Sequence, residues 1–88
     1  MPTIIARHKV GDINAWLEGH QDRLELFAPV SSGFRTFQDM DDPNSVVIIV
    51  ETDNVEKLAF VINDPAHDPV KARHTVLEPI TISTELSF

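Results

Sequence analysis

The segment Ser45–Glu51, which reads SVVIIVE, decides the fold of this 88-residue chain. Successive side chains of a β-strand point to opposite faces, so a strand with one face in water alternates apolar and polar residues. Five consecutive apolar residues stand here instead. One set comprises Val46, Ile48 and Val50, and the opposite set comprises Val47 and Ile49. Both faces of this strand therefore need to be covered.

The N-terminal third of the chain predicts a strand followed by a helix. Residues 3–10 (TIIARHKV) are rich in β-branched residues and are followed by Gly11, which favours a strand. Asp12 stands where a helix N-cap belongs, and Pro29 ends the helix. Polar and charged residues at 21–23 and 25 lie largely off its apolar stripe. At helical spacing that stripe consists of Ile13, Trp16, Leu17, His20, Leu24 and Phe27.

Three further strands follow. Residues 34–40 (FRTFQDM) predict a strand that pairs with Ser45–Glu51 as an antiparallel hairpin. The residues between them, 41–44 (DDPN), are typical of a turn, because proline presets its backbone angle and Asp and Asn tolerate turn conformations. Residues 76–86 read as the last strand, in which Pro79 suits an edge or a bulge.

Two more helices are expected between the third and fourth strands. Asp53 is predicted to begin the first of them, with Glu56 three residues later completing a capping box. Asp68 is predicted to cap a short helix that runs to about His74, with a proline at its first helical position.

The resulting order is β-α-β-β-α-β, which predicts an α+β fold of the split βαβ type. Its four-stranded antiparallel sheet carries the helices on one face. The helices can cover only one of the two apolar sets of SVVIIVE. The other set requires a partner, and the most economical partner is the same sheet of a second copy, so we expect a homodimer through the sheet face.

Composition limits the classes of partner and site. Ordinary globular composition over 88 residues predicts one domain, 1–88. A formal charge of −7 with seven scattered basic residues disfavours nucleic acid and anionic membranes. The chain has no cysteine, which removes disulfides and thiolate chemistry. No signal peptide is recognisable at the N-terminus, so an intracellular, cytoplasmic protein is expected.

Three segments carry a resemblance to a known family: RHKVGDINAWLEGH (7–20), FRTFQDMDDPNSVVIIVETDNVEKL (34–58) and NDPAHDPVKARHTV (63–76). They resemble the dimeric α+β barrel superfamily, and within it small single-domain proteins similar to antibiotic biosynthesis monooxygenases. The resemblance implies a ferredoxin-like protomer, a homodimer with face-to-face sheets, and a small-molecule pocket between helices and sheet. Members include cofactor-independent monooxygenases, haem-degrading enzymes, muconolactone-isomerase-like proteins and polyketide cyclases, so the fold alone does not set the chemistry.

Histidines are the main candidates for chemistry, because no Gly-rich phosphate loop and no HExxH spacing is present. His20 lies at the centre of the apolar stripe, one turn after Trp16. It is therefore either a hydrogen-bonded core residue or a pocket residue that binds a ligand or moves a proton. His8 shares a strand face with Ile4 and Val10. It points into the same pocket if that face looks toward the helices, and into a dimer interface if it does not.

The other candidates have a structural alternative. His74 either lines the pocket or interacts with the end of the short helix. Trp16 is a candidate ligand contact, although aromatic residues mostly fill cores. His67 precedes Asp68 and is expected to be exposed, without a functional role. No metal site is expected, because no histidine pair shows an i, i+3 or i, i+4 spacing, and no cofactor is expected.

Two functions remain from the sequence. In the first, the chain is a cofactor-independent monooxygenase-like or isomerase-like enzyme that uses His20 and His8 as catalytic groups and Trp16 and His74 as ligand contacts. In the second, it is a non-catalytic dimeric protein that binds a ligand or a partner. A cavity lined by His8, Trp16 and His20 would favour the enzyme.

Overall fold

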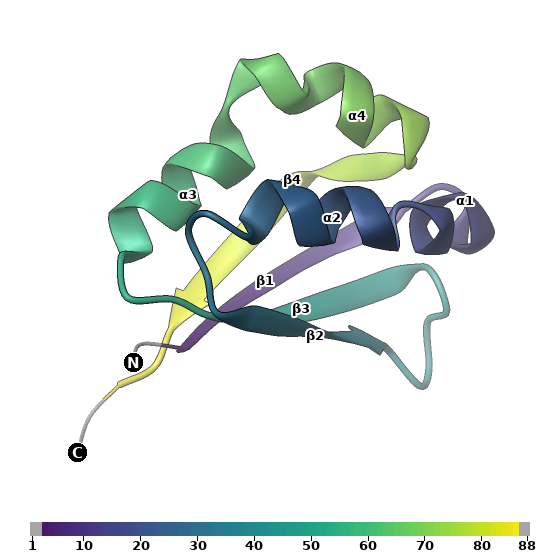
Figure 1. The fold of residues 1–88 in the computed structure, drawn as a ribbon. Coiled ribbons are helices and arrows are strands. Elements are labelled where there is room, and N and C mark those ends of the chain that lie inside the picture. Colours follow the sequence, from purple (N-terminus) through teal and green to yellow (C-terminus); the bar gives the residue numbers. More distant parts are fainter. Residues whose placement is uncertain (1–2, 87–88) are drawn as a thin grey trace.

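The structure is a computed structural model that describes residues 3–86. The strands of the sheet lie in the order β2-β3-β1-β4, and every neighbouring pair is antiparallel. The helices lie together on one face of this sheet (Figure 1). The predicted βαββαβ order is thereby confirmed. Its elements are β1 (Thr3–Val10), α1 (Ile13–Glu18), α2 (His20–Phe27), β2 (Gly33–Gln38), β3 (Ser45–Glu51), α3 (Val55–Asn63), the 3₁₀ helix η1 (Pro65–His67), α4 (Asp68–Arg73) and β4 (Val76–Thr84).

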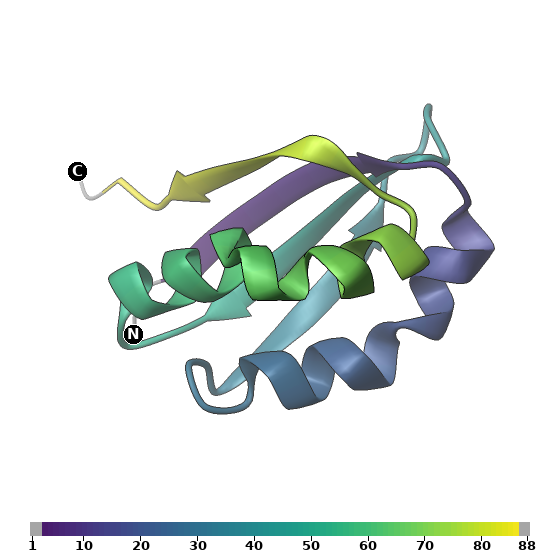
Figure 2. The same cartoon turned by 90° about the horizontal axis from the view of Figure 1, so that it is seen from above.

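The helices form two rows across the sheet. Seen from above, α1 and α2 follow one another along one side, while α3, η1 and α4 run along the other side, nearer to β4 (Figure 2). None of the helices in residues 3–86 is long and apolar enough to span a membrane.

The two apolar sets of SVVIIVE have different destinations. Val46, Ile48 and Val50 are buried beneath the helices, whereas Val47 and Ile49 are only half-buried on the opposite, open face. The register pairs Val46 with His8 on β1. His8 consequently lies on the helix side of the sheet, in the same buried row as Ile4, Ala6 and Val10.

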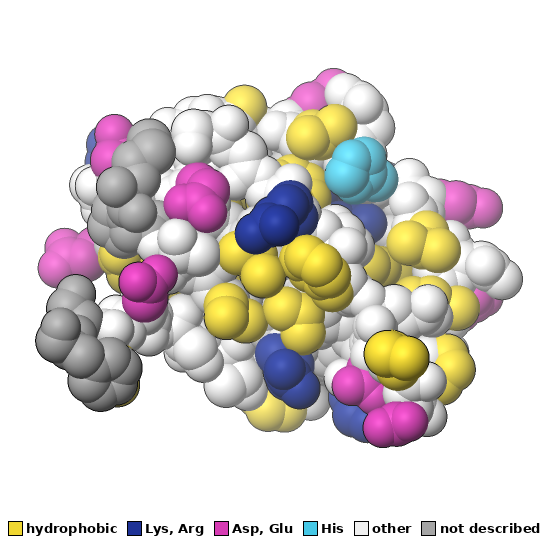
Figure 3. Space-filling model, turned by 90° about the horizontal axis from the view of Figure 1, so that it is seen from below, with side chains coloured by type: hydrophobic (Ala, Val, Ile, Leu, Met, Phe, Trp, Pro, Cys, Tyr) yellow, Lys and Arg dark blue, Asp and Glu magenta, His cyan; other side chains and the backbone are white. Residues whose placement is uncertain are grey.

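The open face of the sheet is apolar at its centre. The register places Ile5 opposite Ile49, and Phe37 opposite Val47. Ile5 is 37% exposed and Phe37 44% exposed. Figure 3 shows hydrophobic side chains gathered on this side of the molecule, with Lys or Arg side chains on either side of the cluster. Among the described residues, nothing packs over this surface.

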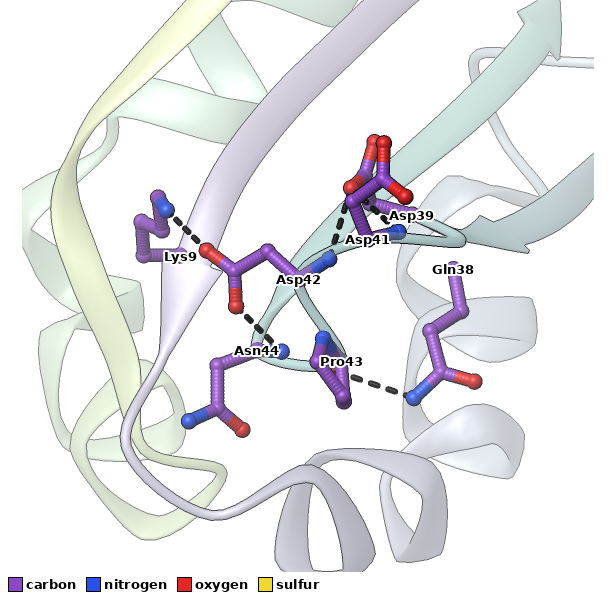
Figure 4. A network of polar contacts seen from close by, with 7 residues as sticks. All are labelled: Lys9, Gln38, Asp39, Asp41, Asp42, Pro43 and Asn44. Carbon is purple, nitrogen blue, oxygen red and sulfur yellow. Dashed lines mark hydrogen bonds and ion pairs between the residues drawn. The ribbon is translucent and has the colours of Figure 1, made fainter.

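The hairpin turn uses its acidic side chains for its own backbone (Figure 4). Asp39 Oδ2 accepts hydrogen bonds from the backbone N–H groups of Asp41 at 3.0 Å and Asp42 at 2.8 Å. Asp42 Oδ1 accepts from the N–H of Asn44 at 3.0 Å, and its other oxygen pairs with Lys9 of β1. These contacts fix the turn and tie it to the neighbouring strand.

Helix starts were predicted with mixed success. Asp12 caps α1 as expected, since its Oδ1 accepts from the N–H of Asn14 at 2.9 Å. The cap of α3 is Asn54 rather than Asp53, because Asn54 Oδ1 accepts from the N–H of Lys57 at 3.0 Å. Asp68 is the first residue of α4 and not its cap. Its backbone is already helical, at φ −57° and ψ −42°, because η1 runs directly into α4.

The largest departure from the sequence-based expectation lies at Gly19. One helix was predicted from Ile13 to the proline at 29, but α1 ends at Glu18 and α2 begins at His20. The buried side of this pair rotates accordingly. Leu17 is 51% and Leu24 40% exposed. The buried positions are instead Trp16, Gly19, Arg23 and Phe27, with Leu26 half-buried.

Candidate functional site

A cavity of about 80 Å³ lies between the helices and the sheet. The sheet contributes Ala6, His8 and Ile48 to its wall, and α1 contributes Trp16. Most of the remaining wall is apolar, as in Phe27, Val50, Ile62, Val76 and Ile80. The polar side chains of its lining are His8, Arg23, His67, Lys71 and His74.

A surface groove of about 340 Å³ adjoins the cavity between α2 and the η1–α4 segment. Four residues line both hollows: Arg23, Leu26, His67 and Val70. These four side chains therefore form the boundary between the groove and the cavity, and we call them the doorway residues. A ligand that extends from the groove into the cavity passes between them.

Arg23 is a buried cation at this doorway, with only 8% of its surface exposed. Its Nη2 donates to the carbonyl oxygen of Trp16 at 2.6 Å, and its guanidinium carbon lies 4.1 Å from the centroid of the Trp16 ring. Its Nε is buried and has no hydrogen-bond partner. Burial lowers the pKa of Arg23 to about 10, which still leaves the side chain charged at neutral pH.

His8 is a buried histidine in the wall of the cavity. Its Nδ1 lies 2.9 Å from the carbonyl oxygen of Lys9, so Nδ1 carries the proton and donates it to that oxygen. Its ring meets the ring of Trp16 edge-on, with centroids 5.7 Å apart. Burial lowers the pKa of His8, and the charges of Arg23 and Lys71 act in the same direction. His8 is therefore neutral at pH 7, with the lone pair on Nε2.

His74 lies at the end of α4, where it bridges to α2. Its Nε2 is 3.3 Å from Asp22 Oδ2, the same oxygen that accepts from Arg73 Nη2 at 3.1 Å. Burial lowers the pKa of His74, and the nearby Arg23 and Arg73 charges reinforce the effect against the attraction of Asp22. The bridge fixes the His74 ring in the wall of the cavity and joins the two sides of the groove.

The structure brings together three of the four predicted site residues. His8, Trp16 and His74 all line the cavity. His20 does not line it: its side chain is exposed, and its ring centroid lies 5.5 Å from that of Phe34. The expectation that His20 occupies the buried stripe is wrong, because the break at Gly19 turns residue 20 outward.

Sequence reasoning missed three polar residues of the cavity: Arg23, His67 and Lys71. Arg23 was assigned to the solvent side of its helix, and His67 was expected to be exposed. In fact His67 is half-buried, and its Nδ1 donates to the carbonyl oxygen of Val61 at 2.9 Å. The sequence held one signal for Arg23, namely its spacing of seven residues from Trp16, which is two helical turns.

The side-chain arrangement does not suggest a metal centre. Within residues 3–86, no group of three or more His, Cys, Asp or Glu side chains is placed to hold a metal ion. The cavity offers a neutral imidazole, a buried guanidinium and apolar surface, which suits binding and proton transfer on a small organic molecule.

Comparison with known proteins identifies the fold. No family model and no curated protein matches the sequence. A candidate antibiotic biosynthesis monooxygenase from Bordetella bronchiseptica superposes with a TM-score of 0.76 at 15% identity, covering 99% of this chain and 96% of that one. The crystal structure of another antibiotic biosynthesis monooxygenase gives 0.71 at 18% identity, covering 100% and 99%.

A third similar structure is SnoaB, a cofactor-independent oxygenase from Streptomyces nogalater. It gives a TM-score of 0.65 at 18% identity, covering 99% of this chain and 92% of that one. These full-length likenesses, at such low identity, establish the fold and not the activity. The resemblance predicted from the sequence is thus confirmed for the architecture: the chain has the α+β fold of the antibiotic biosynthesis monooxygenase proteins.

Proposed function

We propose that this chain is a cofactor-independent enzyme of the oxygenase or isomerase type, with His8 as its general base. The observation that carries this proposal is a buried histidine in the cavity wall whose pKa is lowered and whose Nδ1 proton is already engaged by the Lys9 carbonyl. A neutral imidazole fixed in this tautomer accepts a proton at Nε2. SnoaB, with the same fold, is a cofactor-independent oxygenase, which supports this class of reaction.

The chemistry follows from the two neighbouring groups. His8 Nε2 takes a proton from an acidic C–H or O–H group of the substrate and becomes an imidazolium. The buried charge of Arg23 stabilises the anion that remains. In an oxygenase, the electron-rich anion then reacts with dioxygen. In an isomerase, the imidazolium returns the proton to another carbon. Trp16 holds the His8 ring edge-on and stacks against Arg23, and so positions both.

The size of the cavity favours a second candidate function. Ordinary ligand sites measure about 300 Å³ or more, whereas this cavity holds about 80 Å³. A substrate larger than a few atoms fits only if the doorway side chains move and it extends into the groove. A non-catalytic protein that binds a ligand or a partner needs no such movement, and it is the alternative to the enzyme.

We also propose that the protein works as a homodimer. The apolar centre of the open sheet face includes Ile5, Val47 and Ile49 from adjacent strands. An exposed apolar patch of this kind marks an interaction site. A second copy of the same sheet covers it with a complementary surface through a two-fold axis.

Proton abstraction is testable without knowing the natural substrate. The exchange of solvent deuterium into an α C–H of a weakly acidic aryl ketone, followed by NMR, reports the base directly. We expect wild-type protein to accelerate the exchange and His8→Gln to lose about 100-fold or more of that acceleration. His20→Gln is the matched control, since His20 lies outside the cavity. Equal exchange with the His8→Gln variant would exclude His8 as the base.

Access to the cavity is tested separately. Val70→Trp narrows the doorway, whereas Ala72→Trp places the same ring on an exposed position of α4. We expect Val70→Trp to abolish binding of a small aromatic probe, as followed by amide chemical shifts, and Ala72→Trp to leave it unchanged. Unchanged binding in both variants would show that the ligand sits elsewhere.

A further inference from the structure

The cavity is cationic in a chain that is strongly acidic. The whole chain carries a formal charge of −7, yet none of the described residues that line the cavity is Asp or Glu. Two of the lining residues, Arg23 and Lys71, have basic side chains. Both are close enough to His8 for their charges to lower its pKa. Glu78, which does not line the cavity, acts on His8 in the opposite direction. The charged side chains in the cavity wall itself are therefore cationic, in a protein that is negative as a whole.

Arg23 lacks the partner that a buried cation usually has. A buried charge is costly unless it is paired and fully hydrogen-bonded. Among the described residues, no carboxylate lies within ion-pair distance of Arg23, and its Nε has no acceptor. Its one hydrogen bond goes to the uncharged carbonyl of Trp16. Asp22 is close enough to raise the pKa of Arg23, but its carboxylate pairs with Arg73 and His74. Within residues 3–86, the guanidinium is therefore left without an ion-pair partner of its own.

Lys71 is a second cation with a weak partner. Its Nζ lies 3.7 Å from Glu78 Oε1, and the Glu78 side chain is 63% exposed, so water screens the pair. The Lys71 side chain itself is only 17% exposed. A ligand oxygen in the cavity can therefore replace Glu78 as the partner of this ammonium group at little cost.

We propose, building on the ligand site assigned to the cavity above, that its ligand is a monocarboxylate with an apolar body, whose carboxylate is held by Arg23 and Lys71. The body of such a ligand contacts the apolar wall around Phe27, Ile62 and Val70. A singly charged carboxylate matches the few free donors. A phosphate brings more charge and more acceptor oxygens than one guanidinium and one ammonium group can satisfy in an apolar enclosure.

The test compares probes that share one shape and differ in charge. Benzoate, benzamide and phenyl phosphate are titrated into the ¹⁵N-labelled protein at pH 7, and each Kd is taken from amide chemical shifts. We expect benzoate to bind at least tenfold more tightly than benzamide and phenyl phosphate. Equal Kd values for benzoate and benzamide, or a preference for phenyl phosphate, would overturn the carboxylate assignment.

Substitutions of the two cations test which side chains produce the preference for benzoate over benzamide. In Arg23→Gln the ratio between benzamide and benzoate should fall to about one, and in Lys71→Gln it should fall about threefold. Lys57→Gln is the charge-matched control, because Lys57 is exposed on α3 and does not line the cavity; its ratio should equal that of wild type. If Arg23→Gln does not fold, the Kd ratios of wild type and Lys71→Gln still test the proposal. An unchanged ratio in Lys71→Gln would overturn a carboxylate site made by Arg23 and Lys71 together.

The neutral probe separates this inference from the proposed function. If benzamide binds as tightly as benzoate, the cavity is a ligand site but not a carboxylate site, and the proposed function stands without the inference. If neither compound shifts amides around the cavity, the inference is overturned, and the proposed function is then decided by the deuterium exchange of wild type and His8→Gln.

Discussion

The imidazole of His74 lies against the backbone of Gly19 so closely that a Cβ atom on residue 19 would come within 2.5 Å of its Nδ1. The same histidine is held from the other side by Asp22 of α2. Gly19 is also the residue at which α1 ends and α2 begins. The end of α4 therefore packs against the break between α1 and α2. This packing positions His74 in the cavity wall, and it goes with the rotation of α2 that buries Arg23.

Gly19→Ala should destabilise the protein through this contact. The backbone of Gly19, at φ −83° and ψ 6°, suits alanine, so the cost is the steric clash with His74 and not backbone strain. We expect the free energy of unfolding in urea to fall by about 1–3 kcal/mol, as for other overpacked sites. In a His74→Ala background the same substitution should cost much less. An equal cost in both backgrounds would contradict the contact.

Acidic substitutions on neighbouring residues of β3 should separate the two faces of the sheet. Val47→Asp places a carboxylate on the open face, so it should dissociate the proposed homodimer into folded monomers. Ile48→Asp places one among buried core residues, so it should unfold the protomer. Sedimentation of the wild type should give twice the chain mass, and circular dichroism should distinguish a folded monomer from an unfolded chain. A wild-type monomer at micromolar concentration would contradict the dimer.

The fold could be predicted because its signals are local. Short segments are enough to predict their own secondary structure. Examples are the alternation along β1, the five apolar residues of β3 and the turn residues between β2 and β3. The apolar face that two helices leave uncovered is also visible in the pattern of β3 alone. The start of α3 was misplaced by one residue because Asp53 and Asn54 have similar chemistry and compete for its cap. The break between α1 and α2 at Gly19 was missed for a different reason.

The site was less predictable, because the side of α1 and α2 that is buried depends on a contact with a residue far away in the sequence. Periodicity assigns the apolar Leu17 and Leu24 to the core, yet the neighbouring spacing through Gly19 and Arg23 fits a helix equally well. Glycine gives no side-chain signal, and arginine is rarely buried. The packing of His74, 55 residues after Gly19, favours the second spacing, because it leaves no room for a side chain at residue 19.

The strained backbone of Thr75 gives a further prediction. Its φ of 58° lies in the left-handed region, which a β-branched residue rarely adopts. Its Oγ1 compensates by accepting from the N–H of Asp12 at 2.9 Å and donating to the Asp12 carbonyl at 3.0 Å.

Thr75→Ala keeps the strain and loses both of these hydrogen bonds, so thermal or urea unfolding should show a loss of about 1–3 kcal/mol. Thr75→Gly loses the bonds but relieves the strain, so it should be at least as stable as Thr75→Ala. In ordinary helix or strand positions a glycine variant is less stable than the alanine variant by about 0.5–1 kcal/mol. If Thr75→Gly is likewise less stable than Thr75→Ala, the backbone of residue 75 is not strained.

Lowering the pH should destabilise the protein through His8. Burial lowers the pKa of His8 in the folded state, whereas in the unfolded chain it titrates at about 6.5. Above that pH both states are neutral and the residue contributes no pH dependence. Below it the unfolded state takes up the proton first, so the free energy of unfolding falls until the pH reaches the lower pKa of the folded state.

The His8→Gln variant cannot titrate at this position. Urea unfolding at pH 7 and pH 5 should therefore show a smaller loss of stability for the variant than for wild type. Some loss should persist, because the pKa of His74 is lowered in the same direction. Equal losses in the two proteins would mean that His8 is charged or solvated in the folded state, which would also remove the basis for its role as a general base.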